Sequence, residues 1–304
     1  VDLSTGVAAG GEGIDQLISI EEVGGSNFAD TFLGSEGNDG FQPDALGDEG
    51  AGSNFKVGGA DIIDGKGGID TVSYDNTQND DGFTPSGIVA NLLLGTVVDA
   101  AGNIDRLSNI ENIYGSPYDD NITGDNNANK LEGREENDTL TGGDGNDVIN
   151  GGDGNDIIYG GDGNDIINDG KGYDIIYGGD GIDTFKRDYS ADYGDNAFNA
   201  HINLDIGTIS SPDYPEDTPD YISNVENVTL EGQFNYTVTG NSTDNKILTS
   251  SGEDVIISGL GFDFIDTGAG NDTITLTGNS YYNGLSAHNV GSTTDVATNV
   301  KLDL

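Results

Sequence analysis

The sequence contains no cysteine, methionine or tryptophan, and only 10 of its 304 residues are lysine or arginine. Without cysteine the chain cannot form disulfides, zinc–thiolate sites or a thiol nucleophile. So few cations, set against 55 acidic residues and a net charge of −45, exclude a nucleic-acid partner and disfavour an anionic membrane surface. No apolar run approaches the roughly 20 residues of a membrane span.

Catalytic signatures are missing as well. The sequence has no His-Glu-x-x-His, Gly-x-Ser-x-Gly or phosphate-binding-loop motif. Its only histidines, His201 and His288, lie far apart along the chain, and neither indicates a catalytic or metal-binding role. We therefore expect a protein that is not an enzyme.

Glycine is abundant, with 50 residues, and aspartate recurs in a strict nine-residue period. The pattern G-G-x-G-x-D-x-U-x, in which U is a large apolar residue, keeps one register through 115–186. Its best copies read GGDGNDVIN (142–150), GGDGNDIIY (151–159), GGDGNDIIN (160–168), DGKGYDIIY (169–177) and GGDGIDTFK (178–186). A disordered acidic linker is disfavoured, because it would not keep an apolar residue at position 8 of each repeat.

The same period returns in shorter blocks, which indicate three segments. The first, 1–114, has nonapeptide blocks at 25–42 and 56–73 and longer strands within 88–114. The second, 115–186, is the main repeat, and the third, 187–304, combines longer strands with a block at 240–275. No helical period is evident, so we expect an all-β fold in which the segments form one continuous solenoid.

A longer repeat, of roughly a hundred residues, contains the nonapeptides. Its marker is an Ile/Val-Glu-x-Ile/Val strand, which occurs at 110–113 and 225–228, with a counterpart at 20–23. Because the sequence stops mid-unit, we expect it to be a piece of a larger protein.

Each nonapeptide divides into a turn and a strand. Glycines at positions 1, 2 and 4 allow the positive φ angles of a tight turn, which the aspartate at position 6 ends. Positions 7–9 form a short strand whose central side chain, at position 8, faces inward. Two nonapeptides make one coil, so position-6 aspartates of alternate repeats stack about 4.8 Å apart. One ladder contains Asp147, Asp165 and Asp183, and the other Asp120, Asp138, Asp156 and Asp174.

Stacked carboxylates repel one another. In addition, each repeat buries only one large side chain, and the free energy gained does not offset the conformational entropy lost by ordering nine residues. A hard divalent cation between the turns removes the repulsion. Oxygen-only ligands with flexible geometry favour calcium over magnesium, while the lack of cysteine and near-lack of histidine disfavours zinc or copper. We therefore expect several bound Ca²⁺ ions and a fold that depends on them.

These motifs resemble the RTX, or hemolysin-type, calcium-binding nonapeptide repeat. The resemblance implies a parallel β-roll, or β-solenoid, whose turns hold calcium through position-6 aspartates and glycine-rich backbone carbonyls. It places position-6 ligands at Asp30, Asp39, Asp61, Asp70, Asp120, Asp138, Asp147, Asp156, Asp165, Asp174, Asp183, Asp254, Asp263 and Asp272. It adds the turn residues Gly142, Gly143, Asp144, Gly145, Gly151, Gly152, Asp153, Gly154, Gly160, Gly161, Asp162 and Gly163.

The sequence departs from the family pattern at several positions. Asn129 and Asn245 replace the position-6 aspartate, and Asp169 replaces a first glycine. The repeats at 115–141 lack the second and fourth glycines. Calcium binding is most clearly indicated at 142–168, where the pattern is nearly complete.

Position 7 should face outward, yet it carries Val148, Ile157, Ile166 and Ile175. Tyr159 and Tyr177, at position 9, join Ile157 and Ile175 on the same face. Such a stripe marks either an interface with another module or protomer, or a face that flanking units cover.

The sequence thus predicts a calcium-binding structural module of a secreted or surface-attached bacterial RTX exoprotein or adhesin, which folds on meeting extracellular calcium. The alternative is the non-catalytic folding and targeting module of a secreted RTX protease, lipase or polysaccharide epimerase. In either case we expect calcium as a partner, with other modules of the same protein, a cell surface or a polysaccharide as further candidates.

Overall fold

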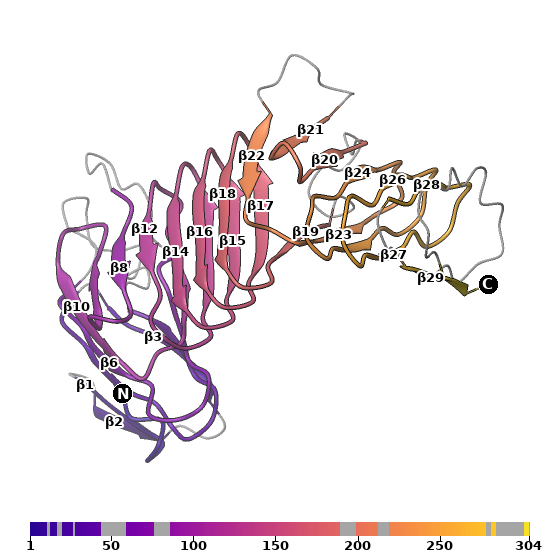
Figure 1. Cartoon of the computed structure of the whole chain (residues 1–304). Coiled ribbons are helices and arrows are strands. Elements are labelled where there is room, and N and C mark those ends of the chain that lie inside the picture. Colours follow the sequence, from indigo (N-terminus) through magenta and orange to yellow (C-terminus); the bar gives the residue numbers. More distant parts are fainter. Residues whose placement is uncertain are drawn as a thin grey trace. The chain divides into compact units, whose positions relative to one another are not determined.

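The computed structural model describes residues 1–10, 13–16, 20–26, 28–43, 59–75, 86–188, 199–211, 219–277, 281–283 and 301–303. All regular elements in these ranges are β-strands (Figure 1). A helix long and apolar enough to cross a membrane does not occur among them. The chain divides into two compact units, 1–157 and 158–304.

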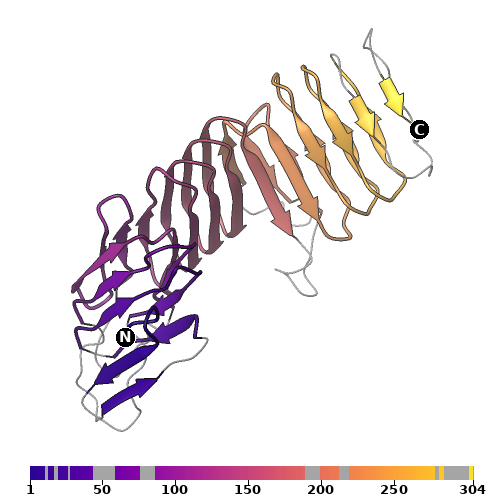
Figure 2. The same ribbon diagram turned by 90° about the horizontal axis from the view of Figure 1, so that it is seen from below.

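The first unit is a roll of two sheets, with a separate antiparallel hairpin formed by β1 (Val7–Gly10) and β2 (Gly13–Gln16). Successive nonapeptide strands alternate between the sheets, so that two repeats make one coil (Figure 2). One sheet runs in the order β14 (Thr139–Asp144), β12 (Asn121–Thr123), β8 (Val89–Asn91), β9 (Thr96–Val98), β10 (Ile104–Ser108), β6 (Ile62–Asp64) and β4 (Thr31–Leu33). The other contains β3 (Glu22–Gly24), β5 (Gly40–Gln42), β7 (Thr71–Ser73), β11 (Asn112–Tyr114), β13 (Lys130–Glu135) and β15 (Val148–Asp153).

The second unit repeats this construction. Its first sheet runs in the order β16 (Ile157–Asp162), β18 (Ile175–Asp180), β22 (Asp220–Ser223), β21 (Thr208–Ser210), β20 (His201–Asn203), β24 (Thr237–Thr239), β26 (Val255–Ile257) and β28 (Thr273–Thr275). Its second contains β17 (Ile166–Lys171), β19 (Thr184–Asp188), β23 (Asn227–Glu231), β25 (Lys246–Leu248), β27 (Phe264–Asp266), β29 (Tyr281–Asn283) and β30 (Lys301–Asp303). The fold is the all-β parallel roll that the sequence predicted.

Among the described residues, the roll of each unit also contains one strand of opposite direction. The alternating stretches expected to form longer strands instead make three-stranded meanders, β8-β9-β10 and β20-β21-β22, in which β9 and β21 pair antiparallel with both neighbours. In the first meander the chain reverses after β8, where Asn91 Oδ1 accepts the Leu94 N–H at 2.8 Å and Gly95 has a φ of 64°. A local turn therefore overrides the alternation of apolar residues.

The position-8 side chains form most of the core between the sheets, as expected, and Tyr74 and Tyr236 are buried as well. All of the position-8 side chains are 7% exposed or less. In the first unit they are Phe32, Phe41, Ile63, Val72, Ala90, Leu107, Ile113, Ile122, Leu131, Leu140 and Ile149. In the second they are Ile158, Ile167, Ile176, Phe185, Ile202, Ile222, Val228, Val238, Ile247, Ile256, Ile265 and Ile274.

The outward apolar stripe is divided between two surfaces, because alternate repeats contribute to different sheets. In the second unit Ile166 lies on β17 and Ile175 on β18, in separate sheets. Tyr159 and Tyr177 stack at a centroid distance of 5.0 Å, and Tyr221 tilts against Tyr177 at 5.9 Å. The tyrosines therefore cover part of one another's ring surface.

Candidate calcium-binding turns

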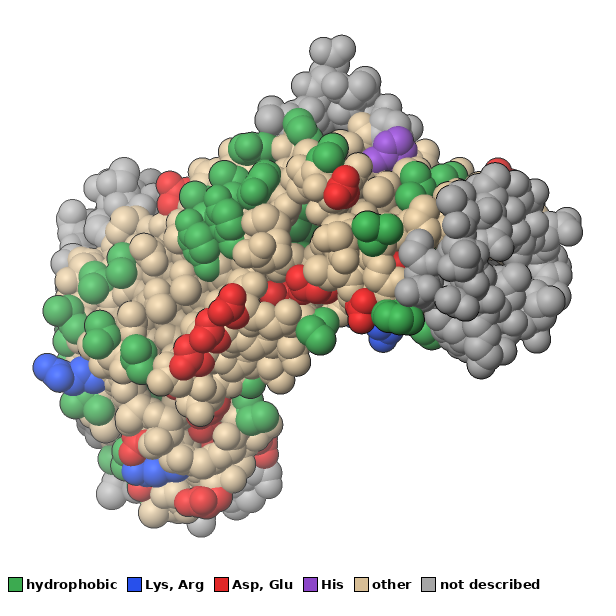
Figure 3. All heavy atoms as spheres, in the orientation of Figure 1, with side chains coloured by type: hydrophobic (Ala, Val, Ile, Leu, Met, Phe, Trp, Pro, Cys, Tyr) green, Lys and Arg blue, Asp and Glu red, His purple; other side chains and the backbone are tan. Residues whose placement is uncertain are grey.

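The position-6 side chains end the turns between strands and point into the roll. Asp30 is half-buried, and all the other aspartates expected at this position are buried. By contrast, the position-3 aspartates Asp144, Asp153, Asp162 and Asp180 are exposed. Figure 3 shows acidic side chains gathered in rows on the visible surface. The two aspartates of one nonapeptide thus lie in different environments.

Many position-6 carboxylates use one oxygen to join successive coils. Oδ1 of Asp138 accepts the backbone N–H of Asp120 at 2.7 Å, and Oδ1 of Asp156 accepts that of Asp138 at 2.8 Å. In the second unit Oδ1 of Asp183 accepts the Asp165 N–H at 2.9 Å. We refer to one such carboxylate and its N–H donor as a rung.

Four acidic residues outside the expected set also form rungs. Glu111 Oε2 accepts the Asp70 N–H at 2.8 Å, and Glu226 Oε2 accepts the Asp183 N–H at 2.9 Å. Asp105 and Asp220 accept the N–H groups of Asp61 at 2.8 Å and Asp174 at 3.1 Å. A signal for the glutamates is present in the Ile/Val-Glu-x-Ile/Val pattern, because there, too, the acid stands two residues before a buried apolar side chain.

The surroundings of the second carboxylate oxygen separate three kinds of turn. In the first kind, Oδ2 is buried without a hydrogen-bond donor, as it is in Asp61, Asp70, Asp138 and Asp183. Where the whole turn is described, at 65–70, 133–138 and 178–183, positions 2 and 4 have positive φ. We call these the open turns. The φ values at positions 2 and 4 are 74° and 126° in 65–70, 95° and 66° in 133–138, and 124° and 145° in 178–183.

The turn at 133–138 adopts the open conformation although it lacks two of the three glycines. Arg134 and Glu136 take positive φ there, a conformation that costs about 1–2 kcal/mol for each residue with a side chain. The surrounding coils therefore impose the backbone shape on a sequence that does not favour it.

The glycine at position 1 is needed for space and not for its φ, contrary to the sequence-based expectation. A Cβ at Gly133 would overlap Oδ2 of Asp138 and the carbonyl oxygen of Gly151. A Cβ at Gly178 would likewise overlap the Asn224 carbonyl and crowd Oδ2 of Asp183. Carboxylate and carbonyl oxygens from two coils thus converge beside each of these glycines.

Burial makes the charged form of these carboxylates costly. Burial raises the pKa of Asp138 to about 9. The hydrogen bond from the Asp120 N–H lowers this pKa, while the charges of Asp120 and Asp156 raise it further. Burial likewise raises the pKa of Asp61 to about 7 and those of Asp70 and Asp183 to about 6. Buried, anionic, oxygen-only groups lacking a donor fit a hard divalent cation such as Ca²⁺.

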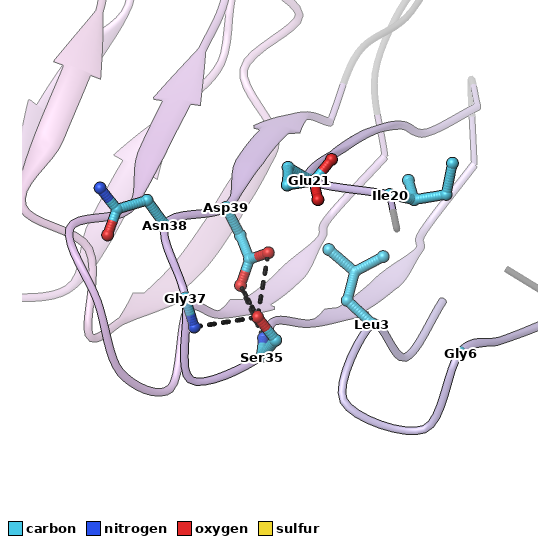
Figure 4. Close-up of a pocket in the computed structure, with 8 residues that line it drawn as sticks. All are labelled: Leu3, Gly6, Ile20, Glu21, Ser35, Gly37, Asn38 and Asp39. Carbon is cyan, nitrogen blue, oxygen red and sulfur yellow. Dashed lines mark hydrogen bonds between the residues drawn. The ribbon is translucent and has the colours of Figure 1, made fainter. Parts of the chain in front are cut away.

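In the second kind of turn, which we call serine-closed, the carboxylate is already satisfied by a serine at position 2. Ser35 donates its N–H to Asp39 Oδ2 at 2.6 Å and its hydroxyl to the same oxygen at 3.0 Å (Figure 4). Ser116 donates its N–H to Asp120 Oδ2 and its hydroxyl to Oδ1, both at 2.7 Å. Ser26 donates both its N–H, at 2.7 Å, and its hydroxyl, at 2.9 Å, to Asp30 Oδ2. The Asp39 turn borders a shallow pocket of about 250 Å³, which Leu3 and Glu21 also line.

Asn129 and Asn245 are likewise satisfied by protein groups. The Asn129 amide accepts the Asp125 N–H at 2.7 Å and donates to the Glu111 carbonyl at 2.9 Å. Asn245 accepts the Asn241 N–H at 2.9 Å and donates to the Glu226 carbonyl at 2.7 Å. An amide can donate as well as accept, so neither turn needs a cation.

Two further turns are closed by threonine at position 1; we call them threonine-capped. Thr249 donates its hydroxyl to Asp254 Oδ2, and Thr267 donates to Asp272 Oδ2, both at 2.7 Å. The Oδ1 atoms of these aspartates accept the N–H groups of Tyr236 and Asp254. Both carboxylate oxygens therefore have donors.

Asp169, at a position where the pattern has glycine, lies in a buried charged cluster. Its carboxylate pairs with the Arg187 guanidinium at 3.1 Å, and both side chains are almost fully buried. One oxygen each from Asp169, Asp174 and Asp220 lie within 4.8 Å of one another. Burial and the charge of Asp169 raise the pKa of Asp220, and Arg187 opposes the rise. An arginine thus supplies positive charge among three acids.

Comparison with known proteins supports this geometry. The family model of the RTX calcium-binding nonapeptide repeat matches residues 58–72, 108–140, 132–167, 159–185 and 239–278. No curated protein matches the chain. The matched segments contain the three open turns, and their repeats form the parallel roll described above. These segments of the chain are RTX calcium-binding nonapeptide repeats.

Proposed function

We propose that this chain is a structural module whose open turns bind calcium and whose main repeat folds only when they do. The observation that carries the proposal is the buried Oδ2 of Asp138 and of Asp183, which has no donor although it lies beside carbonyl oxygens of the next coil. Both kinds of oxygen would coordinate a bound Ca²⁺, whose charge would offset the cost of burying the carboxylates.

The module suits a protein that works outside the cell. Extracellular calcium modules need affinities of only about 10⁻⁴–10⁻³ M, so a chain of this type would remain unfolded where calcium is scarce. RTX calcium-binding repeats are typical of extracellular bacterial proteins. We therefore place the module in a secreted or surface-attached bacterial exoprotein or adhesin, where it acts as a calcium-stiffened spacer.

Circular dichroism during calcium titration tests the proposal. In chelator the spectrum should lack most of the β signal, which should return on adding calcium and return far less with magnesium. Asp138→Asn combined with Asp183→Asn should shift the titration to higher calcium. Asp144→Asn with Asp180→Asn is the matched control, because these aspartates are exposed. A full β signal in chelator would contradict calcium-dependent folding.

A further inference from the structure

The repeat pattern assigns the same role to all position-6 aspartates, but their hydrogen bonds do not. Asp138 and Asp183 leave Oδ2 without a donor, whereas Asp254 and Asp272 receive a hydroxyl there. The family match covers both groups, since it includes 132–185 and 239–278. Membership of the repeat family therefore does not separate them.

The difference arises from the residue at position 1. Gly133 and Gly178 leave room beside Oδ2, into which a Cβ would intrude. Thr249 and Thr267 place a side chain at the corresponding position of their turns, and both are buried, at 8% and 0% exposure. Each hydroxyl is within 2.7 Å of the oxygen that a cation would need.

We propose that Thr249 and Thr267 replace calcium in their turns, so that a hydroxyl at position 1 closes a turn to the ion. The inference rests on the proposed calcium-binding function of the open turns and limits its extent. A hydrogen bond to a carboxylate is stronger than one between neutral groups, and it requires no dissolved ion. The two turns that lead into β26 and β28 are thus closed by protein groups alone.

In the serine-closed turns, donors at position 2 take the place of the threonine hydroxyl. Ser35 and Ser116 each supply two donors to the position-6 carboxylate from position 2. Their backbone does not have the positive φ found at Arg134 and Gly179. Asp39 and Asp120 therefore belong with the calcium-independent group.

A change in calcium stoichiometry tests the inference. In the full chain, Thr249→Gly with Thr267→Gly should add up to two bound calcium ions per molecule, counted by equilibrium dialysis. Thr249→Ser with Thr267→Ser, which keeps both hydroxyls, should add none. An unchanged count in the glycine variant, with its β signal intact in calcium, would overturn the inference.

A second pair of variants tests it without creating a site. Asp254→Asn with Asp272→Asn should leave the wild-type count unchanged, as expected from turns that hold no ion. Asp138→Asn with Asp183→Asn should lower the count by up to two. A loss of ions in the Asp254/Asp272 variant overturns the inference, even if the glycine variant fails to fold. Failure of the wild type to bind calcium at all would instead refute the proposed function.

Discussion

The backbone N–H of Asp120 donates to Oδ1 of Asp138, one coil further along, at 2.7 Å. The same bond recurs between Asp138 and Asp156 at 2.8 Å. The aspartate that the repeat pattern assigns to a metal thus already holds two coils together through one oxygen. The other oxygen takes no part in this bond, and its surroundings differ from turn to turn.

Replacing Glu136 by glycine should stabilise the calcium-loaded protein by about 0.5–1 kcal/mol. Glu136 is exposed and has a φ of 66°, so the change removes backbone strain, partly offset by the added freedom of the unfolded chain. Glu135→Gly, at a neighbouring residue without positive φ, should destabilise by a similar amount. Urea denaturation at saturating calcium measures both. Equal shifts in the two variants would contradict the strain at Glu136.

Replacing Gly133 by alanine should weaken calcium binding and lower stability. The added Cβ would overlap Asp138 Oδ2 and the Gly151 carbonyl, the two oxygens that converge beside this glycine. Gly37→Ala is the matched control, because its Cβ would meet only the Ser35 hydroxyl at an ordinary 3.5 Å. Calcium titrations of both variants should show a higher midpoint for Gly133→Ala alone.

Truncating Glu111 to alanine should destabilise the first unit by about 1–3 kcal/mol, since it leaves the Asp70 N–H without its acceptor. Glu111→Gln keeps an acceptor oxygen and should cost much less. Glu132→Ala, which removes a surface ion pair with Lys130, should cost at most about 1 kcal/mol. Thermal melts in calcium distinguish these cases, and a harmless Glu111→Ala would show that the rung contributes little.

Breaking the buried Arg187–Asp169 pair should cost about 3–5 kcal/mol in Arg187→Met, because the buried charge of Asp169 then loses the guanidinium that balances it. Asp169→Asn with Arg187→Met should recover most of the loss, since no buried charge of this pair remains. A double-mutant cycle measured by chemical denaturation provides the coupling energy. Additive effects of the two changes would mean that the pair does not act as a unit.

Much of the fold follows from the sequence because the nonapeptide is short and regular. An apolar residue every ninth position, with a glycine-rich turn between strands, leaves few alternatives to a roll, and the position-8 core from Phe32 to Ile274 lies where expected. The antiparallel strands β9 and β21 were not predicted, because the turns that reverse the chain lie inside stretches with apolar alternation.

The site was only partly predictable, because hydrogen-bond donors come from residues that the repeat pattern leaves unspecified. Ser35 and Thr249 are unremarkable in the sequence, yet each decides what surrounds an aspartate. Asp39 and Asp254 look like Asp138 in the repeat pattern. The glutamate rungs were overlooked for a related reason, since Glu111 and Glu226 end turns that have no glycine-rich motif.

Asn129 and Asn245 each place a neutral side chain among the stacked acids. Each amide lies between a glutamate, Glu111 or Glu226, to whose carbonyl it donates, and an aspartate, Asp147 or Asp263, which accepts its backbone N–H. The acids on either side are thus two strand spacings apart, about 9.6 Å, slightly more than the screening length of physiological salt. Both units therefore contain an electrically neutral step in the acidic ladder, which lowers the repulsion between the acids on either side.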